Sequence, residues 1–257
     1  MKSTIKALGY TLISFIVVAL VVIFVVAVQS KKVVLPERPA FAQYAAGIER
    51  KTVFFEYMAQ LVNYNNQEIL KERNTLLDHQ AHAGNLWWFE KEEVFDIASR
   101  YNLEFFDINK PEDWAQLVKR VDIVPTSLAL AQSANESAWG LSRFAQKGHN
   151  YFGQWCYKKG CGFVPSRRNT GAVHEVARFN TPIESVKSYM RNINTHRAYK
   201  SLRNIRAKLR AQNKAITGLA LATGLLQYSE KREVYVNEIK HMIRYNKLDQ
   251  LDSVIYK

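Results

Sequence analysis

Residues 127–140 restrict the fold more than any other part of the chain, because they predict a helix built almost entirely from small side chains. The segment reads Ser-Leu-Ala-Leu-Ala-Gln-Ser-Ala-Asn-Glu-Ser-Ala-Trp-Gly. Pro125 presets the backbone at the predicted helix start, and Gly140 predicts its end. Alanine and serine keep such a helix thin, so neighbouring helices can approach it closely. The sequence therefore predicts a core helix with other helices packed around it.

This helix carries one carboxylate, Glu136, near its C-terminus. Gln132, Ser133 and Glu136 share one helix face and form a narrow polar stripe, which indicates a face that lines a cleft. The helix dipole and burial against Trp139 would both raise the pKa of Glu136. A carboxyl group that keeps its proton near neutral pH can protonate a glycosidic oxygen. The alternative is an ordinary solvated glutamate.

The N-terminal region contains an uncharged apolar run of 22 residues, Ala7–Val28. A helix of this length spans a hydrocarbon core of about 30 Å. A cleavable signal has a shorter apolar region and a small-x-small exit, which the residues after the run match poorly. The pattern favours an uncleaved anchor over a cleaved signal. We assign residues 1–30 to the anchor or signal peptide and residues 31–46 to a linker.

Beyond the linker, helical periodicity predicts a helical extension over residues 47–122 and a second domain over residues 123–250. Trp87 and Trp88 of the extension are interpreted as anchors to the core, with contact to sugar rings as the alternative. Residues 150–180 contain helix-breaking glycines among aromatic and branched side chains, which predicts a small β-hairpin lobe. The predicted fold is therefore mainly α-helical with a small β lobe.

Two cysteines, Cys156 and Cys161, flank a short turn in the predicted hairpin. A disulfide between them would fit an oxidising compartment, and a reduced pair is the alternative. A zinc site is not expected, because no second Cys or His pair stands at ligand spacing. We expect neither a metal nor another cofactor.

The formal net charge of +13 suits nucleic acid, anionic lipid or an acidic polymer as a partner. The apolar run and the cysteine pair favour the cell envelope. We therefore expect no nucleic acid partner.

Several segments, in order along the chain, resemble the peptidoglycan N-acetylglucosaminidases of glycoside hydrolase family 73, named after mannosyl-glycoprotein endo-β-N-acetylglucosaminidase. The first, Ser127–Gly140, is similar to the catalytic helix of that family, and Asn150–Gly153 looks like its Asn-Leu-Phe-Gly element. Residues 177–189, 227–235 and 243–248 resemble its later segments. The resemblance covers roughly residues 120–250 and implies a lysozyme-like fold.

The resemblance implies that Glu136 is the general acid. It also suggests Glu175, on the hairpin, as the group that activates water, and Tyr228 as a tyrosine facing the cleft floor. A lysine-paired surface role for Glu175 and core packing for Tyr228 are the alternatives.

The candidate substrate-binding residues are Gln132, Asn150, Phe152 and Trp155. Tyr189 and Tyr235 are interpreted as core residues. Glu184 is interpreted as a structural residue in the first turn of a helix.

The implied activity is hydrolysis of β-1,4 bonds in peptidoglycan glycan strands by an endo-β-N-acetylglucosaminidase. A lytic transglycosylase and a non-catalytic wall-binding scaffold are the alternatives. The protein is expected to be a monomer. We expect it to be anchored in the inner membrane with its catalytic domain in the periplasm, or to be periplasmic after signal cleavage.

Overall fold

A computed structural model describes residues 17–19, 35–165, 171, 173–228, 230 and 232–253. The chain divides into two compact units, Met1–Pro36 and Glu37–Lys257. Only residues 17–19 of the predicted membrane span are described, and they are helical. Within the described ranges, no helix has the length and apolar character needed to cross a bilayer. The predicted anchor otherwise lies outside the described residues, so it stays a prediction.

The second unit begins earlier than the predicted end of the linker at residue 46. A short 3-10 helix, η1 (Phe41–Gln43), buries Phe41 against the rings of Phe54 and Tyr57, with centroids 5.4 and 5.8 Å away. The guanidinium of Arg38 donates to the carbonyl of Gln146 at 3.2 Å. Hydrophobic burial of one aromatic ring therefore fixes the second half of the predicted linker on the folded unit.

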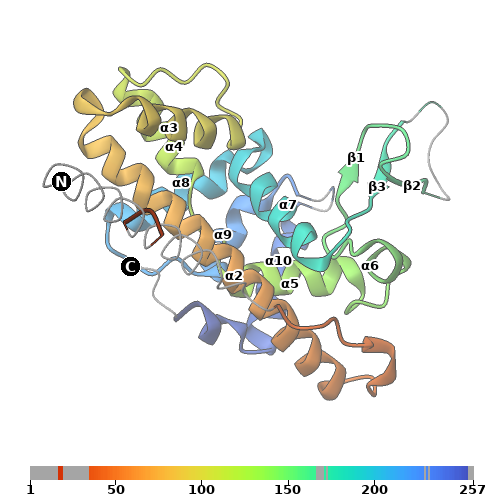
Figure 1. The fold of residues 1–257 in the computed structure, drawn as a ribbon. Coiled ribbons are helices and arrows are strands. Elements are labelled where there is room, and N and C mark those ends of the chain that lie inside the picture. The colour runs from red at the N-terminus through yellow and green to blue at the C-terminus, as the bar shows by residue number, and fades with distance from the viewer. Residues whose placement is uncertain are drawn as a thin grey trace, which may run out of the picture. The chain divides into compact units, whose positions relative to one another are not determined.

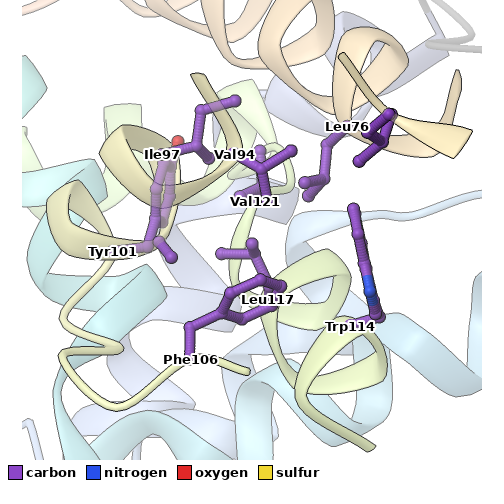
Figure 2. Packing of buried hydrophobic residues seen from close by; sticks show 10 residues of the cluster. Leu76, Val94, Ile97, Tyr101, Phe106, Trp114, Leu117 and Val121 are labelled. Atoms are coloured by element: carbon purple, nitrogen blue, oxygen red, sulfur yellow. The ribbon is translucent and has the colours of Figure 1, made fainter. Parts of the chain in front are cut away.

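Three helices make up most of the predicted extension: α2 (Ile48–Ala81), α3 (Trp88–Arg100) and α4 (Pro111–Arg120). In α4, Pro111 lies in the first turn, with acidic residues near the N-terminus and basic residues near the C-terminus, as the helix dipole favours. The three helices share a buried cluster that includes Leu76, Val94, Ile97, Tyr101, Phe106, Trp114, Leu117 and Val121 (Figure 2).

The two tryptophans expected to anchor this region do not do so. Trp87 and Trp88 are 68% and 69% exposed, and the adjacent Phe89 is also exposed. The anchoring role falls instead to Trp114, whose ring is buried and whose indole N–H donates to the carbonyl of Ile108 at 2.8 Å. A buried tryptophan needs such a partner for its N–H group.

Helix α5 (Thr126–Ser137) is the core helix that the small residues predicted. It packs against α2, α9 (Gly218–Leu221), α10 (Glu233–Tyr245) and the 3-10 segment η5 (Leu248–Ser253). A Cβ atom at Gly218 would lie 2.1 Å from the hydroxyl oxygen of Ser127, so α9 can approach α5 only through glycine. Small side chains on both helices therefore permit this close contact.

The start of α5 is held by a buried carboxylate from the end of the chain. Asp252 accepts hydrogen bonds from the backbone N–H and the hydroxyl of Ser127, at 3.0 and 2.5 Å, and from the N–H of Gly218 at 2.8 Å. The helix ends at Ser137, earlier than the predicted stop at Gly140. Ala138 and Trp139 already adopt positive φ, at 49° and 59°, before Gly140 at 78°.

The β lobe is a three-stranded antiparallel sheet in the order β1-β3-β2, with strands β1 (Trp155–Cys156), β2 (Gly162–Phe163) and β3 (Glu175–Ala177). It follows the short helix α6 (Arg143–Gly148). A disulfide joins Cys156 and Cys161, with Cα atoms 6.2 Å apart, which confirms the expected pairing. Within residues 37–257, the sheet lies at one end and α3 and α4 at the other (Figure 1).

The remaining helical elements follow the sheet in sequence. They are α7 (Pro182–Thr195), η3 (Arg197–Tyr199), α8 (Lys200–Ala211), α9, η4 (Ala222–Leu225), α10 and η5. The architecture confirms the predicted fold class, mainly helical with a small β lobe.

A buried ionic group links α4, α7 and α8. Arg206 is fully buried and donates to the carbonyls of Lys119, Asp122 and Ile123 and to the side chain of Asn194. Arg210 binds both carboxylate oxygens of Asp122, at 2.5 and 2.6 Å. These bonds fix the loop that leads into α5.

Candidate active site

Glu136 is the penultimate residue of α5, and its carboxyl group is half-buried. Its Oε1 accepts a hydrogen bond from the hydroxyl of Tyr235 at 3.1 Å. Its Oε2 lies beside Gly153, where an added Cβ atom would come within 3.3 Å. One carboxylate oxygen is therefore bound by α10, and the other faces the loop before β1.

Burial raises the pKa of Glu136, while hydrogen bonds from the side chains of Tyr235 and Asn135 oppose the shift; the net pKa is raised. The predicted direction is confirmed. The ring of Trp139 packs edge-on against Phe54 and Phe55. Burial therefore outweighs the hydrogen bonds that stabilise the charged form.

Gln132 does not line a cleft, because its side chain is completely buried one helical turn before Glu136. Its amide nitrogen donates to the hydroxyl oxygen of Tyr235 at 3.1 Å, and its amide oxygen accepts from Tyr189 at 2.6 Å. Ser133 is buried too, with its hydroxyl bonded to the carbonyl of Leu130. Gln132 and Ser133 of the polar stripe thus point into the protein, which corrects the substrate-binding role predicted for Gln132.

Tyr228 lies next to this group. Its ring stacks on Tyr235 with centroids 5.3 Å apart, and its hydroxyl donates to the carbonyl of Phe152 at 3.1 Å. Burial, followed by the proximity of Tyr235 and Glu136, raises the pKa of Tyr228 well above its ordinary value. Tyr228 therefore remains a neutral phenol beside the acid.

Two of the predicted substrate-binding residues, Asn150 and Phe152, are buried and do not lie at the surface. Asn150 is buried, and its side chain bonds the carbonyls of Gln154 and Ala177 and the N–H of Gln154. Phe152 is buried and stacks on Tyr189 at 3.9 Å. Both residues shape the turn that brings Gly153 to Glu136, so they cannot contact a sugar directly.

Trp155 is the predicted binding residue that the structure leaves accessible. It begins β1, two residues after Gly153, and is 58% exposed. Its indole ring stacks on the imidazole of His174 at 4.3 Å. An aromatic face held in this way can pack on the C–H surface of a sugar ring.

Glu175 is built into the β lobe. It is 5% exposed, and its two oxygens accept from the N–H groups of Gly160 and Gly162 at 3.0 and 2.8 Å. The geometry gives this carboxylate a structural use, the support of the turn closed by the disulfide. Its predicted role in activating water is not tested and stays a prediction.

The sulfurs of Cys156 and Cys161 and a carboxylate oxygen of Glu175 lie within 4.8 Å of one another. Because the sulfurs are joined in a disulfide, they do not offer thiolate ligands. We assign no metal to this group. Glu184 has the structural role expected of it, since it accepts from the N–H of Asn180 at 3.0 Å.

The interpretation of Tyr189 and Tyr235 as core residues missed the polar ends of their side chains. Both are buried, as predicted, but their hydroxyl groups connect to Glu136 through Gln132 and directly. A signal was present in principle, because a buried tyrosine needs a hydrogen-bond partner for its hydroxyl group. The sequence offered no means of identifying that partner.

Comparisons with known proteins identify the family of the chain. The family described as Glucosaminidase, mannosyl-glycoprotein endo-beta-N-acetylglucosaminidase, matches residues 111–248, from the first residue of α4 to the start of η5. The chain is 35% identical over 208 residues to Protein bax of Escherichia coli (strain K12), covering 81% of this chain and 74% of that protein. No solved structure gives a significant match. The chain belongs to the mannosyl-glycoprotein endo-β-N-acetylglucosaminidase family.

Proposed function

We propose that this protein is a peptidoglycan hydrolase that cleaves β-1,4 glycosidic bonds of the glycan strand, with Glu136 as general acid. Family membership supports a glycoside hydrolase-like enzyme acting on a glycan. The single observation that carries the assignment is the half-buried carboxyl of Glu136, whose pKa is raised and whose Oε1 accepts from Tyr235 while its Oε2 faces Gly153. A general acid needs this combination of a retained proton and an open oxygen.

The bond preferred is the N-acetylglucosaminyl one. In the proposed first step, Glu136 gives its proton to the glycosidic oxygen as the bond from that oxygen to the anomeric carbon breaks. A nucleophile forms the new bond to the anomeric carbon. Water then delivers its hydroxyl group to that carbon as the bond between the carbon and the nucleophile breaks, and the remaining proton of the water returns to Glu136.

The geometry favours the substrate as the source of the nucleophile. The described groups that act on Glu136 are tyrosines and one asparagine, and Glu175 is engaged by the turn of the β lobe. The 2-acetamido oxygen of N-acetylglucosamine can attack its own anomeric carbon, as in substrate-assisted hydrolases. In this proposal Tyr228, a neutral phenol stacked on Tyr235, orients that group through its hydroxyl oxygen, since its hydrogen is donated to the carbonyl of Phe152.

We extend the proposal to cellular context. The substrate is the peptidoglycan glycan strand, and the apolar run in residues 1–30 anchors a monomeric protein in the inner membrane with its catalytic domain in the periplasm. A periplasmic form released by signal cleavage is the alternative. The disulfide supports an oxidising compartment.

The full-length chain, purified in mild detergent and incubated with sacculi, tests the activity. Reducing ends are labelled by borohydride reduction and identified by mass spectrometry. New N-acetylglucosamine ends support the proposal, new muramic acid ends indicate the neighbouring bond, and anhydromuramic ends indicate lytic transglycosylation. The matched control is Glu136→Gln, with circular dichroism to confirm its fold. If native protein releases no more fragments than this variant, the proposal fails.

A non-catalytic wall-binding scaffold is a second candidate, favoured by the net charge of +13. A basic protein is drawn to anionic polymers without any chemistry at a site. This alternative predicts salt-sensitive retention on sacculi with unchanged glycan length, and the same incubation decides between the two.

A further inference from the structure

The hydrogen bonds behind Glu136 form a chain with a defined direction. Tyr189 is buried, and Gln132 is the hydrogen-bond partner that its hydroxyl has among the residues with described positions, at 2.6 Å. Tyr189 must therefore donate to the amide oxygen, since the reverse orientation would leave a buried hydroxyl proton without an acceptor. The amide nitrogen of Gln132 then donates to the hydroxyl oxygen of Tyr235 at 3.1 Å.

The hydroxyl group of Tyr235 consequently acts as a donor to Glu136. Its oxygen already accepts from Gln132, and Oε1 of Glu136 lies 3.1 Å away as the acceptor. We propose that Tyr189, Gln132 and Tyr235 are positioning residues that direct a hydrogen bond to Oε1 and thereby place the acidic proton of Glu136 on Oε2. Oε2 is the oxygen that faces Gly153.

Under this assignment, the two carboxyl oxygens of Glu136 have different roles. Oε1 remains an acceptor throughout, and Oε2 carries the proton to be transferred. The identity of the receiving atom, the glycosidic oxygen, rests on the proposed function. The location of the proton is a property of the free protein and can be tested without substrate.

Among the residues that the structure describes, the other groups around Glu136 do not supply a competing charge. The facing groups are Asn135 on α5 itself, Tyr189 on α7, Tyr199 at the end of η3, Tyr228 before α10, and Tyr235 on α10. Burial raises the pKa of each of these tyrosines, so all are neutral near pH 7. In the described part of the chain, the hydrogen bond that Tyr235 donates to Oε1, and not an ion pair, therefore distinguishes the two oxygens.

The first test replaces Tyr235 with phenylalanine in the full-length chain. Loss of a donor to the carboxylate destabilises the charged form, so the pKa of Glu136 should rise by about one pH unit. The alkaline limb of the pH–rate profile on sacculi should move upward by the same amount, because the protonated acid is the active form. Gln132→Met and Tyr189→Phe should give smaller shifts in the same direction, since they leave Tyr235 present but free to turn.

The matched control is Tyr199→Phe, which removes a nearby phenol that does not belong to the series of hydrogen bonds from Tyr189 to Glu136. The alkaline limb of its pH–rate profile should stay in place. The pKa of Glu136 is also read directly by carbon NMR of its carboxyl carbon, with the signal assigned by its loss in Glu136→Gln. This reading remains possible if sacculi are not cleaved, so failure of the enzyme proposal is distinguishable from failure of this one. An unchanged or lowered pKa in Tyr235→Phe overturns the inference, as does a loss of stability in all three variants without any shift.

Discussion

Two carboxylates that flank α5, Asp122 and Glu136, have pKa values shifted in opposite directions. Before the helix, Asp122 is buried, and although burial alone would raise its pKa, Arg206, Arg210 and Arg73 hold it below its usual value. At the other end, Glu136 is half-buried without an ion pair in the described part of the chain, and burial raises its pKa. Burial is thus common to both, and the partner decides whether the group stabilises the fold as an anion or keeps a proton for chemistry.

The largest effect on stability is expected at Asp122. Replacing it with asparagine leaves the guanidinium of Arg206 in the interior without its counter-charge, which costs about 3–5 kcal/mol in free energy of unfolding. Urea denaturation at pH 7 measures this loss, and Glu136→Gln provides the same chemical change at the other end of the helix. Equal stability of the two variants would remove the distinction drawn between the two sites.

The same pair predicts opposite responses to acid. The native pKa of Asp122 is lowered, so its contribution to stability is present above the unfolded value of about 3.9 and is lost as the pH falls through the native pKa. Denaturation curves of the native chain and of Asp122→Asn should therefore converge as the pH is lowered toward 2. A difference that stayed constant down to that pH would show that charge pairing is not the source of the stability.

Glu175 tests whether a third carboxylate resembles Asp122 or Glu136. Its oxygens accept from two backbone N–H groups, of Gly160 and Gly162, and glutamine can satisfy only one of them. We expect Glu175→Gln to lose about 1–3 kcal/mol of stability. Activity on sacculi at a temperature where the variant is folded should fall less than tenfold. A loss as large as that of Glu136→Gln would instead make Glu175 part of the chemistry.

What the sequence could predict differs between these residues for a physical reason. The core helix and its acid are local features: small side chains, a proline start and one carboxylate lie within a single segment. The use of Glu175 and Asp122 depends on which N–H groups and guanidinium groups the fold brings to them. Such contacts join residues far apart in the chain, so spacing along the sequence cannot reveal them.

The burial of individual side chains was equally hard to predict from the sequence. Trp87 and Trp88 were expected to be buried because they are large and apolar, yet both are exposed. Asn150 was predicted to bind the substrate, yet it is buried with its amide used by the turn. Residue type sets the cost of burial, but it does not set where the partners are.

A substitution at Gly153 should change stability only slightly while lowering activity strongly. Its φ of 63° costs alanine about 1 kcal/mol, and the added methyl group would come within 3.3 Å of Oε2 of Glu136. We expect Gly153→Ala to unfold at a slightly lower urea concentration but to lose activity at least tenfold. Gly160→Ala is the control, since that residue also has positive φ and an open Cβ position. Equal activity losses in the two would show that backbone strain, and not crowding of the acid, is responsible.

The smallest effect is expected from the titration of Glu136 itself. Because its native pKa is raised, the folded state binds the proton more tightly than the unfolded chain, whose value is about 4.3. The native protein should therefore lose stability as the pH rises through that value and up to the native pKa, by about 1 kcal/mol or less. Glu136→Gln has no titrating carboxyl group at this position, so its free energy of unfolding should increase relative to that of the native chain across this pH range. Urea denaturation at half-unit pH steps measures the difference, whose sign is opposite to that at Asp122. If the free energy of unfolding of Glu136→Gln instead fell relative to that of the native chain as the pH rises, the native pKa of Glu136 would be lowered, and such an acid could not serve as the general acid at neutral pH.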